Sequence, residues 1–250
     1  MRLQRLVVGL LGAALLGAVP VALTTTSAEA GAALPTRIKL DKTAKVYKYG
    51  QKTVIAGTVE AYEPTVCAPE TWCSGFDTSG GQITLQSRKA GSSTWKTLGT
   101  RADESSFSFS PTSKGSVVYR VLYNGGTDGT YTFQSSSKDR TAKGSRHPHS
   151  KGVKSGGRLY YRGNVDPGWG HKPVTIQKKS CKSCSWRGYT TVRTSSTGGY
   201  SARIYAPSSG RWYFRSIVKA TKPRFVQATG GVIYTYRART ARGAGAGIGG

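Results

Sequence analysis

The sequence predicts an all-β protein. Short runs place apolar or small residues at every second position, as in Thr53–Val59, Leu159–Val165 and Tyr200–Ile204. Such alternation is typical of strands with one buried face. Clusters of Gly, Pro and Ser separate these runs, and almost no stretch has apolar residues at helical spacing. We therefore expect a β-sandwich or barrel made of many short strands.

The first 30 residues have the features of a secretion signal. Two arginines precede an apolar stretch that runs to about Leu23, and the segment closes on Ala28-Glu29-Ala30. Small residues in this A-x-A pattern are typical of signal peptidase cleavage. A membrane anchor is disfavoured because Pro20 interrupts the stretch and no basic cluster follows it. We expect cleavage after this triplet and a secreted mature chain, Gly31–Gly250.

The chain matches itself at several places, which predicts two repeats. Ile83–Lys96 aligns with Val174–Arg187, so that Trp95 falls on Trp186, and Gly115–Tyr123 aligns with Gly210–Val218. The predicted organisation is a signal peptide at 1–30, repeat one at 31–137 with an inserted loop at 60–81, a linker at 138–150, repeat two at 151–238, and a disordered Gly/Ala tail at 239–250.

Four features stand out in the repeats: the small-polar strands around Gly57 and Gly163, the hairpins Thr84–Trp95 and Thr175–Trp186, the strand opening Gly199–Ser201 in repeat two, and the Tyr119–Val121 strand in repeat one. With these motifs each repeat resembles the bacterial Ig-like modules of secreted and surface proteins, especially those of high-GC Gram-positive bacteria. The resemblance implies two tandem antiparallel β-sandwich domains. It also implies a spacer, adhesion or ligand-presenting role rather than a chemical one.

Four cysteines form two close pairs, which predicts the disulfides Cys67–Cys73 and Cys181–Cys184 in an oxidising compartment. Two other interpretations are weaker. A redox C-x-x-C motif normally opens a helix, and a four-cysteine zinc site would need pairs of similar spacing that converge from separate domains. We therefore expect no metal and no cofactor.

Candidate catalytic residues are few. His147 and His149 fall in the expected linker, and His171 falls in a Gly/Pro-rich loop. A catalytic triad needs a histidine held by a carboxylate, but the only acid after Asp139 is Asp166, in an Asp-Pro-Gly turn. The other candidate acids flank the first cysteine pair without a distinctive spacing: Glu60, Glu63, Glu70 and Asp77. We expect no enzyme, and the alternative that stays open is a secreted enzyme or factor with its site at this acidic loop.

Charge divides the chain. Residues 31–145 hold 15 Lys/Arg and 9 Asp/Glu, a net of +6, whereas residues 146–250 hold 20 Lys/Arg and one Asp, a net of +19. A field this one-sided attracts polyanions. The second repeat is therefore where a partner is expected.

Alternation predicts which of these charges face the solvent. If Leu159 and Tyr161 are buried, their neighbours along the strand point outward, and the same holds for the strand after Tyr200. The predicted anionic-polymer site consists of Arg158, Tyr160, Arg162, Arg203 and Tyr205 on one sheet, with Tyr213, Arg215 and Lys179 on the other.

Arginine beside aromatic rings suits phosphates, sulfates, nucleic-acid backbones and sugar rings. The sequence thus predicts a non-enzymatic, secreted interaction or spacer module, free of a transmembrane anchor, that is attracted to anionic cell-wall or extracellular polymers. Two alternatives stay open at this point: a secreted basic protein that binds nucleic acid, and a charged face that serves solubility alone.

Overall fold

The computed structural model describes residues 33–62, 72–74, 80–102, 104–240 and 243–250. Within these ranges every regular element is a β-strand, from β1 to β20. Nearly all strand pairs are antiparallel; among the paired named strands, β2 with β11 is the parallel exception. The all-β prediction is confirmed.

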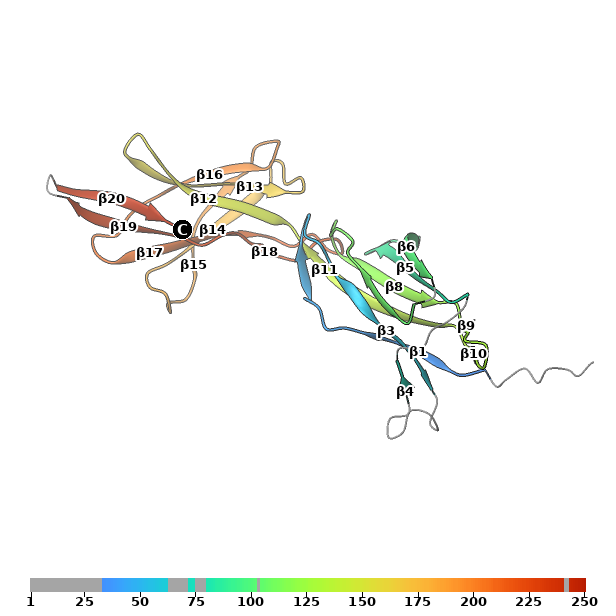
Figure 1. Cartoon of the computed structure of the whole chain (residues 1–250). Helices are drawn as coiled ribbons and strands as arrows, with labels where there is room; N and C mark the ends of the chain where they lie inside the picture. Colours follow the sequence, from blue (N-terminus) through green and yellow to red (C-terminus); the bar gives the residue numbers. More distant parts are fainter. Residues whose placement is uncertain (1–32, 63–71, 75–79, 103, 241–242) are drawn as a thin grey trace, which may run out of the picture. The chain divides into compact units, whose positions relative to one another are not determined.

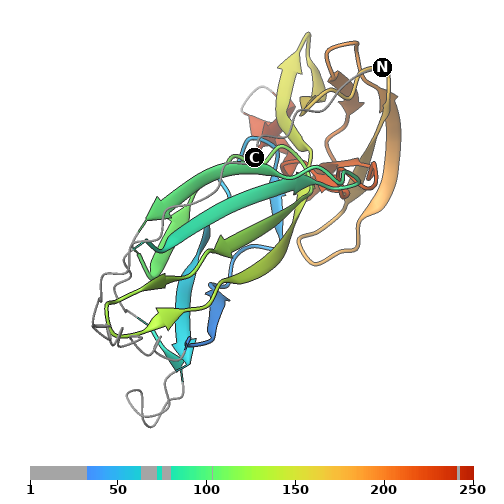
Figure 2. The ribbon, with the colours of Figure 1, turned by 90° about the vertical axis from the view of Figure 1, so that its right-hand side faces the viewer.

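Residues 34–145 contain two sheets with one core between them (Figures 1 and 2). The first sheet consists of β1 (Thr36–Leu40), β3 (Ile55–Tyr62), β4 (Trp72–Cys73) and β7 (Ser106–Phe109). The second has the order β2 (Val46–Lys48), β11 (Ser136–Ser145), β8 (Val117–Tyr123), β5 (Gln82–Lys89) and β6 (Lys96–Ala102). A short hairpin is formed by β9 (Gly126–Thr127) and β10 (Thr132–Phe133). Alternate residues of both sheets fill the core, among them Ile55, Val59, Ile83, Leu85 and Val121.

Residues 147–249 repeat this arrangement around a second core. One sheet has the order β12 (His147–Ser155), β13 (Arg158–Asp166) and β16 (Gly199–Ile204). The other has the order β15 (Arg187–Arg193), β14 (Pro173–Lys179), β17 (Arg211–Val218), β19 (Ile233–Thr240) and β20 (Gly243–Gly249), with β18 (Ala228–Thr229) on β17. The predicted inward residues Leu159, Tyr161, Val165, Ala202 and Ile204 are buried in this core, which confirms the alternation argument for β13 and β16.

The strand order in both sandwiches is that of an Ig-like fold. Apart from the short strands β2, β4, β9, β10 and β18 and the C-terminal β20, each sandwich has seven strands in the described part of the chain. The first, second and fifth of these form one sheet, and the third, sixth and seventh lie together in the other, with the fourth at its edge. Both sandwiches also interrupt the third strand with a register shift at a matched place, between Leu85 and Gln86 in β5 and between Ile176 and Gln177 in β14. The hairpins that carry Trp95 and Trp186 therefore have the same local construction.

The segment 138–150, predicted to be a linker, is instead almost entirely strand. β11 pairs with β8, and all nine residues of β12 pair with β13. Its polar composition fits its low burial: within 138–150 only Ala142, Gly144, Ser145, Arg146 and Pro148 are buried, and the other residues are exposed or half-buried. The expectation of a linker was wrong because strands that bury so few side chains pair with β8 and β13 without an apolar pattern in their own sequence.

The tail was also predicted wrongly for its described part, residues 243–250, since β20 pairs with β19 from Gly243 to Gly249. Ala246 and Ile248 pack on the second core. On the opposite side, the ring of Tyr236 lies over Gly247 and the ring of Tyr234 over Gly249, where any Cβ would collide with them. Glycine supplies no apolar surface of its own here, but it lets two tyrosine rings lie flat across the strand.

Replacing Gly247 with Val should detach β20. The added side chain must displace the Tyr236 ring, so we expect a loss of about 1–3 kcal/mol in the free energy of unfolding, measured by urea denaturation. Gly245→Val is the matched control, because a Cβ at Gly245 meets nothing within 4 Å. Equal losses in both variants would contradict the ring-over-glycine account.

A buried polar network crosses the second core. The hydroxyl of Tyr200 donates to Oγ of Ser216 at 3.1 Å, and the backbone N–H of Ser216 donates to the hydroxyl of Tyr161 at 3.0 Å. The Tyr161 hydroxyl in turn donates to the carbonyl of Gly231 at 2.7 Å. Burial raises the pKa of Tyr200 to about 12. The hydroxyls of Tyr161, Tyr200 and Ser216, which would be costly unpaired in a sandwich core, thus all have hydrogen-bond partners.

Candidate polyanion-binding face

A row of aromatic and cationic side chains crosses the outer face of the sheet β15-β14-β17-β19. Lys179 of β14 is in register with Tyr213 of β17, which is in register with Tyr234 of β19. The Lys179 ammonium lies 5.5 Å from the centroid of the Tyr213 ring and 4.9 Å from that of Trp186, directly before β15. The rings of Tyr213 and Tyr234 are 6.1 Å apart. The row therefore spans three strand spacings, about 14 Å.

Further side chains flank this row on the same face. Arg215 lies 4.4 Å from the Trp186 ring, Arg211 lies 4.7 Å from the Tyr234 ring, and the Tyr236 ring is 6.1 Å from that of Tyr234. We call the whole set the aromatic–cation face; its members are Lys179, Trp186, Arg211, Tyr213, Arg215, Tyr234 and Tyr236. Cation–π contacts at these distances hold the cations over the rings, so the charges stay at fixed places on the sheet.

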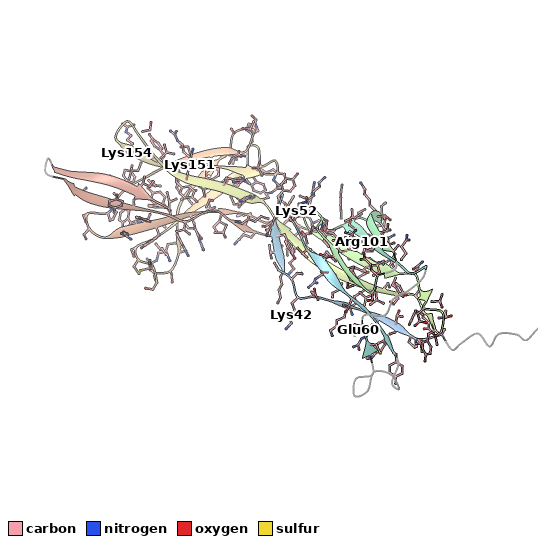
Figure 3. The ribbon with its side chains drawn as sticks, in the orientation of Figure 1. Lys42, Lys52, Glu60, Arg101, Lys151 and Lys154 are labelled. Carbon is pink, nitrogen blue, oxygen red and sulfur yellow. A yellow bond between two sulfur atoms is a disulfide. The ribbon has the colours of Figure 1, made fainter. Side chains whose placement is uncertain are left out.

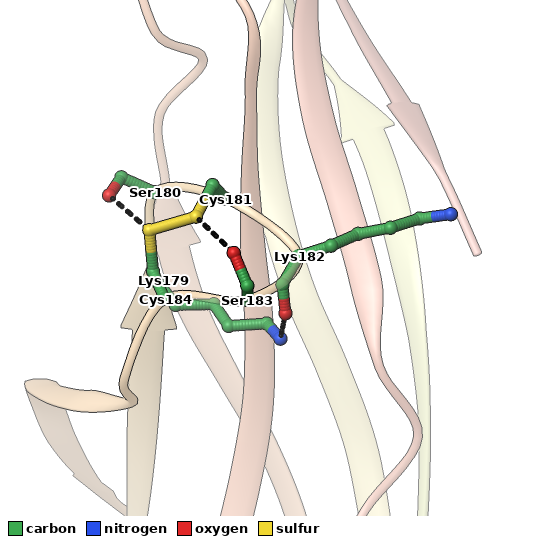
Figure 4. Close-up of a disulfide and its surroundings, with 6 residues drawn as sticks. All are labelled: Lys179, Ser180, Cys181, Lys182, Ser183 and Cys184. Atoms are coloured by element: carbon green, nitrogen blue, oxygen red, sulfur yellow. Dashed lines mark hydrogen bonds between the residues drawn. A yellow bond between two sulfur atoms is a disulfide. The ribbon is translucent and has the colours of Figure 1, made fainter.

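The tip of the β14–β15 hairpin is closed by the Cys181–Cys184 disulfide (Figure 4), which confirms that predicted bridge. Inside the tip, the Lys179 ammonium donates to the carbonyl of Lys182 (Figure 4). The hairpin tip thus holds the Lys179 ammonium at the end of β14, and Trp186 follows it directly before β15. The bridge positions one end of the aromatic–cation face.

Replacing both Cys181 and Cys184 with Ser should lower the free energy of unfolding by about 2 kcal/mol, the entropy that a ring of this size removes from the unfolded chain. Urea denaturation with and without a reducing agent measures this loss. A reducing agent should lower the free energy of unfolding of the wild-type chain more than that of the variant, which has no Cys181–Cys184 bridge to lose. A variant as stable as the wild type would show that the bridge adds nothing to the hairpin.

The matched hairpin of the first sandwich provides an internal comparison. Trp95 is likewise flanked by two cations, Arg88 at 5.0 Å and Arg120 at 4.2 Å. Here, however, Arg120 forms a forked ion pair with Asp139, at 2.7 and 3.1 Å, whose hydrogen bonds lower the pKa of that carboxyl. At Trp186 the corresponding Arg215 donates to the neutral amide of Gln177 at 2.9 Å. Among the described residues, no carboxylate pairs with the cations around Trp186.

The opposite sheet carries the other predicted residues. Tyr160 is in register with Arg203, while Arg162 lies 4.9 Å from the Tyr160 ring and Arg203 lies 5.1 Å from the Tyr205 ring. Lys151 of β12, labelled in Figure 3, is in register with Arg162. This second face is defined by Lys151, Arg158, Tyr160, Arg162, Arg203 and Tyr205. It holds smaller aromatic surface than the aromatic–cation face and no tryptophan.

The eight predicted site residues are therefore divided between two sheets. Lys179, Tyr213 and Arg215 lie together on the aromatic–cation face, and the other five lie on the second face. Sequence reasoning missed Trp186, Arg211, Tyr234 and Tyr236. Two of them could have been predicted as outward residues, because Tyr234 and Tyr236 alternate with Ile233 and Thr235, which are buried.

The acids proposed for a catalytic alternative can be judged at one position. Glu60 is buried and bound by Arg37 at 2.6 Å and Lys39 at 3.0 Å. Burial alone would raise the pKa of Glu60, but the hydrogen bonds from Lys39 and Arg37 outweigh it and lower that pKa. Such a carboxylate is held ionised as a structural ion pair, which is unsuited to a general acid. Glu63, Glu70, Asp77 and Cys67 lie outside the described residues; Cys73, the expected partner of Cys67, is disulfide-bonded.

The histidines are placed at the edge of the second sandwich. His149 Nε2 is 3.3 Å from Asp166 Oδ2, and the His147 and His149 rings are 3.8 Å apart. Burial and then the charge of His149 lower the pKa of His147. In the described part of the chain, no group of three or more His, Cys, Asp or Glu side chains is arranged to hold a metal ion. Within the same ranges, no helix is long and apolar enough to cross a membrane.

Comparisons with known proteins give little beyond the architecture. No protein-family model matches the sequence, and no curated protein matches it. Among solved structures, the chain is similar to the selenomethionine-substituted crystal structure of the chicken interferon gamma receptor alpha chain, with 12% sequence identity over 80% of this chain and 96% of that chain, at a TM-score of 0.44. A likeness this distant carries no weight for function, so the Ig-like assignment rests on the strand order described above.

Proposed function

We propose that this chain is a secreted, non-enzymatic binding module that attaches to anionic extracellular or cell-wall polymers through the aromatic–cation face. The observation that carries the proposal is the contrast between two matched hairpins. Of the two cations beside Trp95, Arg120 is paired with Asp139, whereas neither cation beside Trp186 has a carboxylate partner among the described residues. The second hairpin therefore offers free positive charge on an aromatic platform.

The chemistry of this face matches a polymer that combines rings with anionic groups. Flat aromatic side chains stack on sugar rings, and guanidinium groups bind phosphate, sulfate or carboxylate by forked hydrogen bonds. The face extends over about 14 Å, from the start of β15 to β19, so it can follow several units of an extended chain rather than a single ion. Its fixed rings and cations reduce the entropy lost on binding.

The setting that fits this proposal is the outside of a bacterial cell. The secretion signal expected at residues 1–30, the paired cysteines and the resemblance to tandem Ig-like modules of high-GC Gram-positive bacteria support it. In this view the first sandwich, with a net charge of +6 over residues 31–145, is a spacer, and the second, with +19 over residues 146–250, is the binding unit. Fractionation of a culture tests this location. The protein should be found in the wall fraction and should be released from it by a salt wash.

Retention of residues 31–250 on immobilised polymers tests the binding function. Dextran sulfate and a phosphate-rich wall polymer should retain the protein at low salt, while neutral dextran should not. The logarithm of the affinity should fall linearly with the logarithm of the salt concentration, because each contact releases a counterion. Failure to bind either polyanion at low salt, or retention that molar salt leaves unchanged, would overturn the proposal.

Nucleic acid is the competing ligand, since stacked aromatic rings among cations also suit single-stranded nucleic acid. A single-stranded oligonucleotide of matched charge is therefore included in the same series. Tighter binding of the oligonucleotide than of dextran sulfate at equal salt would replace the polysaccharide assignment with a nucleic-acid one.

A further inference from the structure

Arg146, the residue between β11 and β12, is a buried arginine without an acidic partner. Its exposed fraction is only 7%. Its guanidinium lies between two aromatic rings, 4.7 Å from the centroid of Trp169 and 4.3 Å from that of Phe225. These rings are themselves buried, at 3% and 2% exposure. The Arg146 guanidinium thus contacts two buried aromatic rings.

The hydrogen bonds of Arg146 go to neutral oxygens. Its Nη1 donates to the carbonyls of Pro167 and Gly168, and its Nη2 donates to the hydroxyl of Thr221 at 3.2 Å. Its Nε is buried and has no hydrogen-bond partner. A buried charge with an unmet donor is costly, and burial followed by repulsion from Arg224 lowers the pKa of Arg146. The site as described lacks a negative group.

An open cavity of about 440 Å³ adjoins this arginine. Three exposed cations, Lys172, Lys222 and Arg224, line it together with Arg146, and none of its lining residues is acidic. Asp166, which directly precedes the lining residue Pro167, is already engaged by Asn164 at 3.1 Å and His149 at 3.3 Å. Four positive side chains therefore converge on one cavity with no internal compensation.

The walls of the cavity are held in place by local bonds. Thr221 and Phe225 exchange two backbone hydrogen bonds of 2.9 Å across the loop that carries Lys222 and Arg224. The Trp169 ring that contacts Arg146 is fixed in turn, because its indole N–H donates to the carbonyl of Pro173 at 3.0 Å. The cations thus surround a preformed site, which lowers the cost of binding.

We propose that this cavity binds a tetrahedral oxyanion, a phosphate or sulfate group, with Arg146 at its base and Lys172, Lys222 and Arg224 at its rim. Arginine recognises such groups by forked hydrogen bonds and lysine by point charge. The cavity is larger than one ion, so a group carried on a sugar also fits. The site shares no residue with the aromatic–cation face and does not depend on the polymer-binding proposal.

Calorimetric titration of residues 31–250 with sodium sulfate, inorganic phosphate and a sugar phosphate, at constant ionic strength, tests this site. One saturable site is expected. Replacing both Lys172 and Arg224 with Gln should weaken binding at least about tenfold through the loss of two charge-assisted contacts. The matched control removes two cations elsewhere, Lys179→Gln with Arg211→Gln, and should bind the ion as the wild type does.

Arg146→Lys retains the charge but loses the hydrogen bonds to Pro167, Gly168 and Thr221 that position it, so it should also weaken binding, with circular dichroism confirming that the variant is folded. Tighter binding of the sugar phosphate than of the free ion, lost in the rim variant, would identify the group as part of a larger ligand; equal binding would identify the ion itself. The absence of saturable binding, or equal affinities in the rim variant, the control and the wild type, would overturn the proposal. Because the control variant impairs the other face, a failure of one site is distinguishable from a failure of the other.

Discussion

Replacing Lys179, Arg211 and Arg215 together with Gln is expected to move elution from dextran sulfate to much lower salt. These cations lie over Trp186, Tyr213 and Tyr234, so each is poised to contact an anionic group on a stacked polymer. Each lost contact should reduce the slope of log affinity against log salt by about 1. The expected total is a slope smaller by about 3, with affinity at low salt reduced by roughly a hundredfold.

The control for this variant removes the same charge from the second face, by Arg158→Gln, Arg162→Gln and Arg203→Gln. All three of these arginines are exposed, so folding should be preserved. A smaller change in elution is expected than for the first variant. Equal changes in the two variants would show that net charge, rather than the aromatic–cation face, accounts for retention.

Alkaline pH should destabilise the second sandwich through Tyr200. Its phenol has a pKa of about 12 in the folded chain because it is buried, against an ordinary value near 10. Below pH 10 both states hold the proton and the full stability is present. As the pH rises from about 10 to about 12, the unfolded chain releases its proton while the folded chain does not, so stability falls. Two pKa units correspond to about 2.7 kcal/mol.

The contribution of Tyr200 can be separated from those of the other tyrosines. Burial also raises the pKa of Tyr119 and Tyr189, so the wild-type loss is a sum over several groups. Urea denaturation from pH 9 to pH 12 should show a smaller loss in Tyr200→Phe than in the wild type. Tyr205→Phe, which changes a phenol of 51% exposure, should follow the wild-type curve. A Tyr200→Phe variant with the wild-type pH dependence would contradict the assignment.

Much of the fold could be predicted from the sequence because alternation is a local property. β13 and β16 alternate clearly, and their buried residues are those that the period-two pattern selects; β3 follows the pattern up to Val59, after which Glu60 is buried as well. β20 could not be predicted, because its stability depends on tyrosine rings from β19 that lie over its glycines. β11 and β12 were missed because their own composition is polar and few of their side chains are buried, although β12 pairs with the strand that directly follows it.

The candidate site was predictable only in outline. Alternation identified Tyr213 and Arg215 as outward residues, but it could not assemble the row, which depends on register across β14, β17 and β19. The register shift at Ile176/Gln177 also decides where the hairpin places Trp186 relative to Lys179. The Arg146 cavity was not foreseen at all, since this residue was assigned to a linker.

Mapping the bound polymer by NMR shows whether it contacts the aromatic–cation face. In a titration of ¹⁵N-labelled residues 31–250 with a short dextran sulfate oligosaccharide, monitored by NMR, the account predicts the largest shifts at the Trp186 indole and at the amides of Lys179, Tyr213 and Tyr234. The matched Trp95 indole, whose neighbour Arg120 is paired with Asp139, should move little. Shifts of equal size at Trp95 and Trp186, or shifts confined to the face of Arg158, Arg162 and Arg203, would contradict the account.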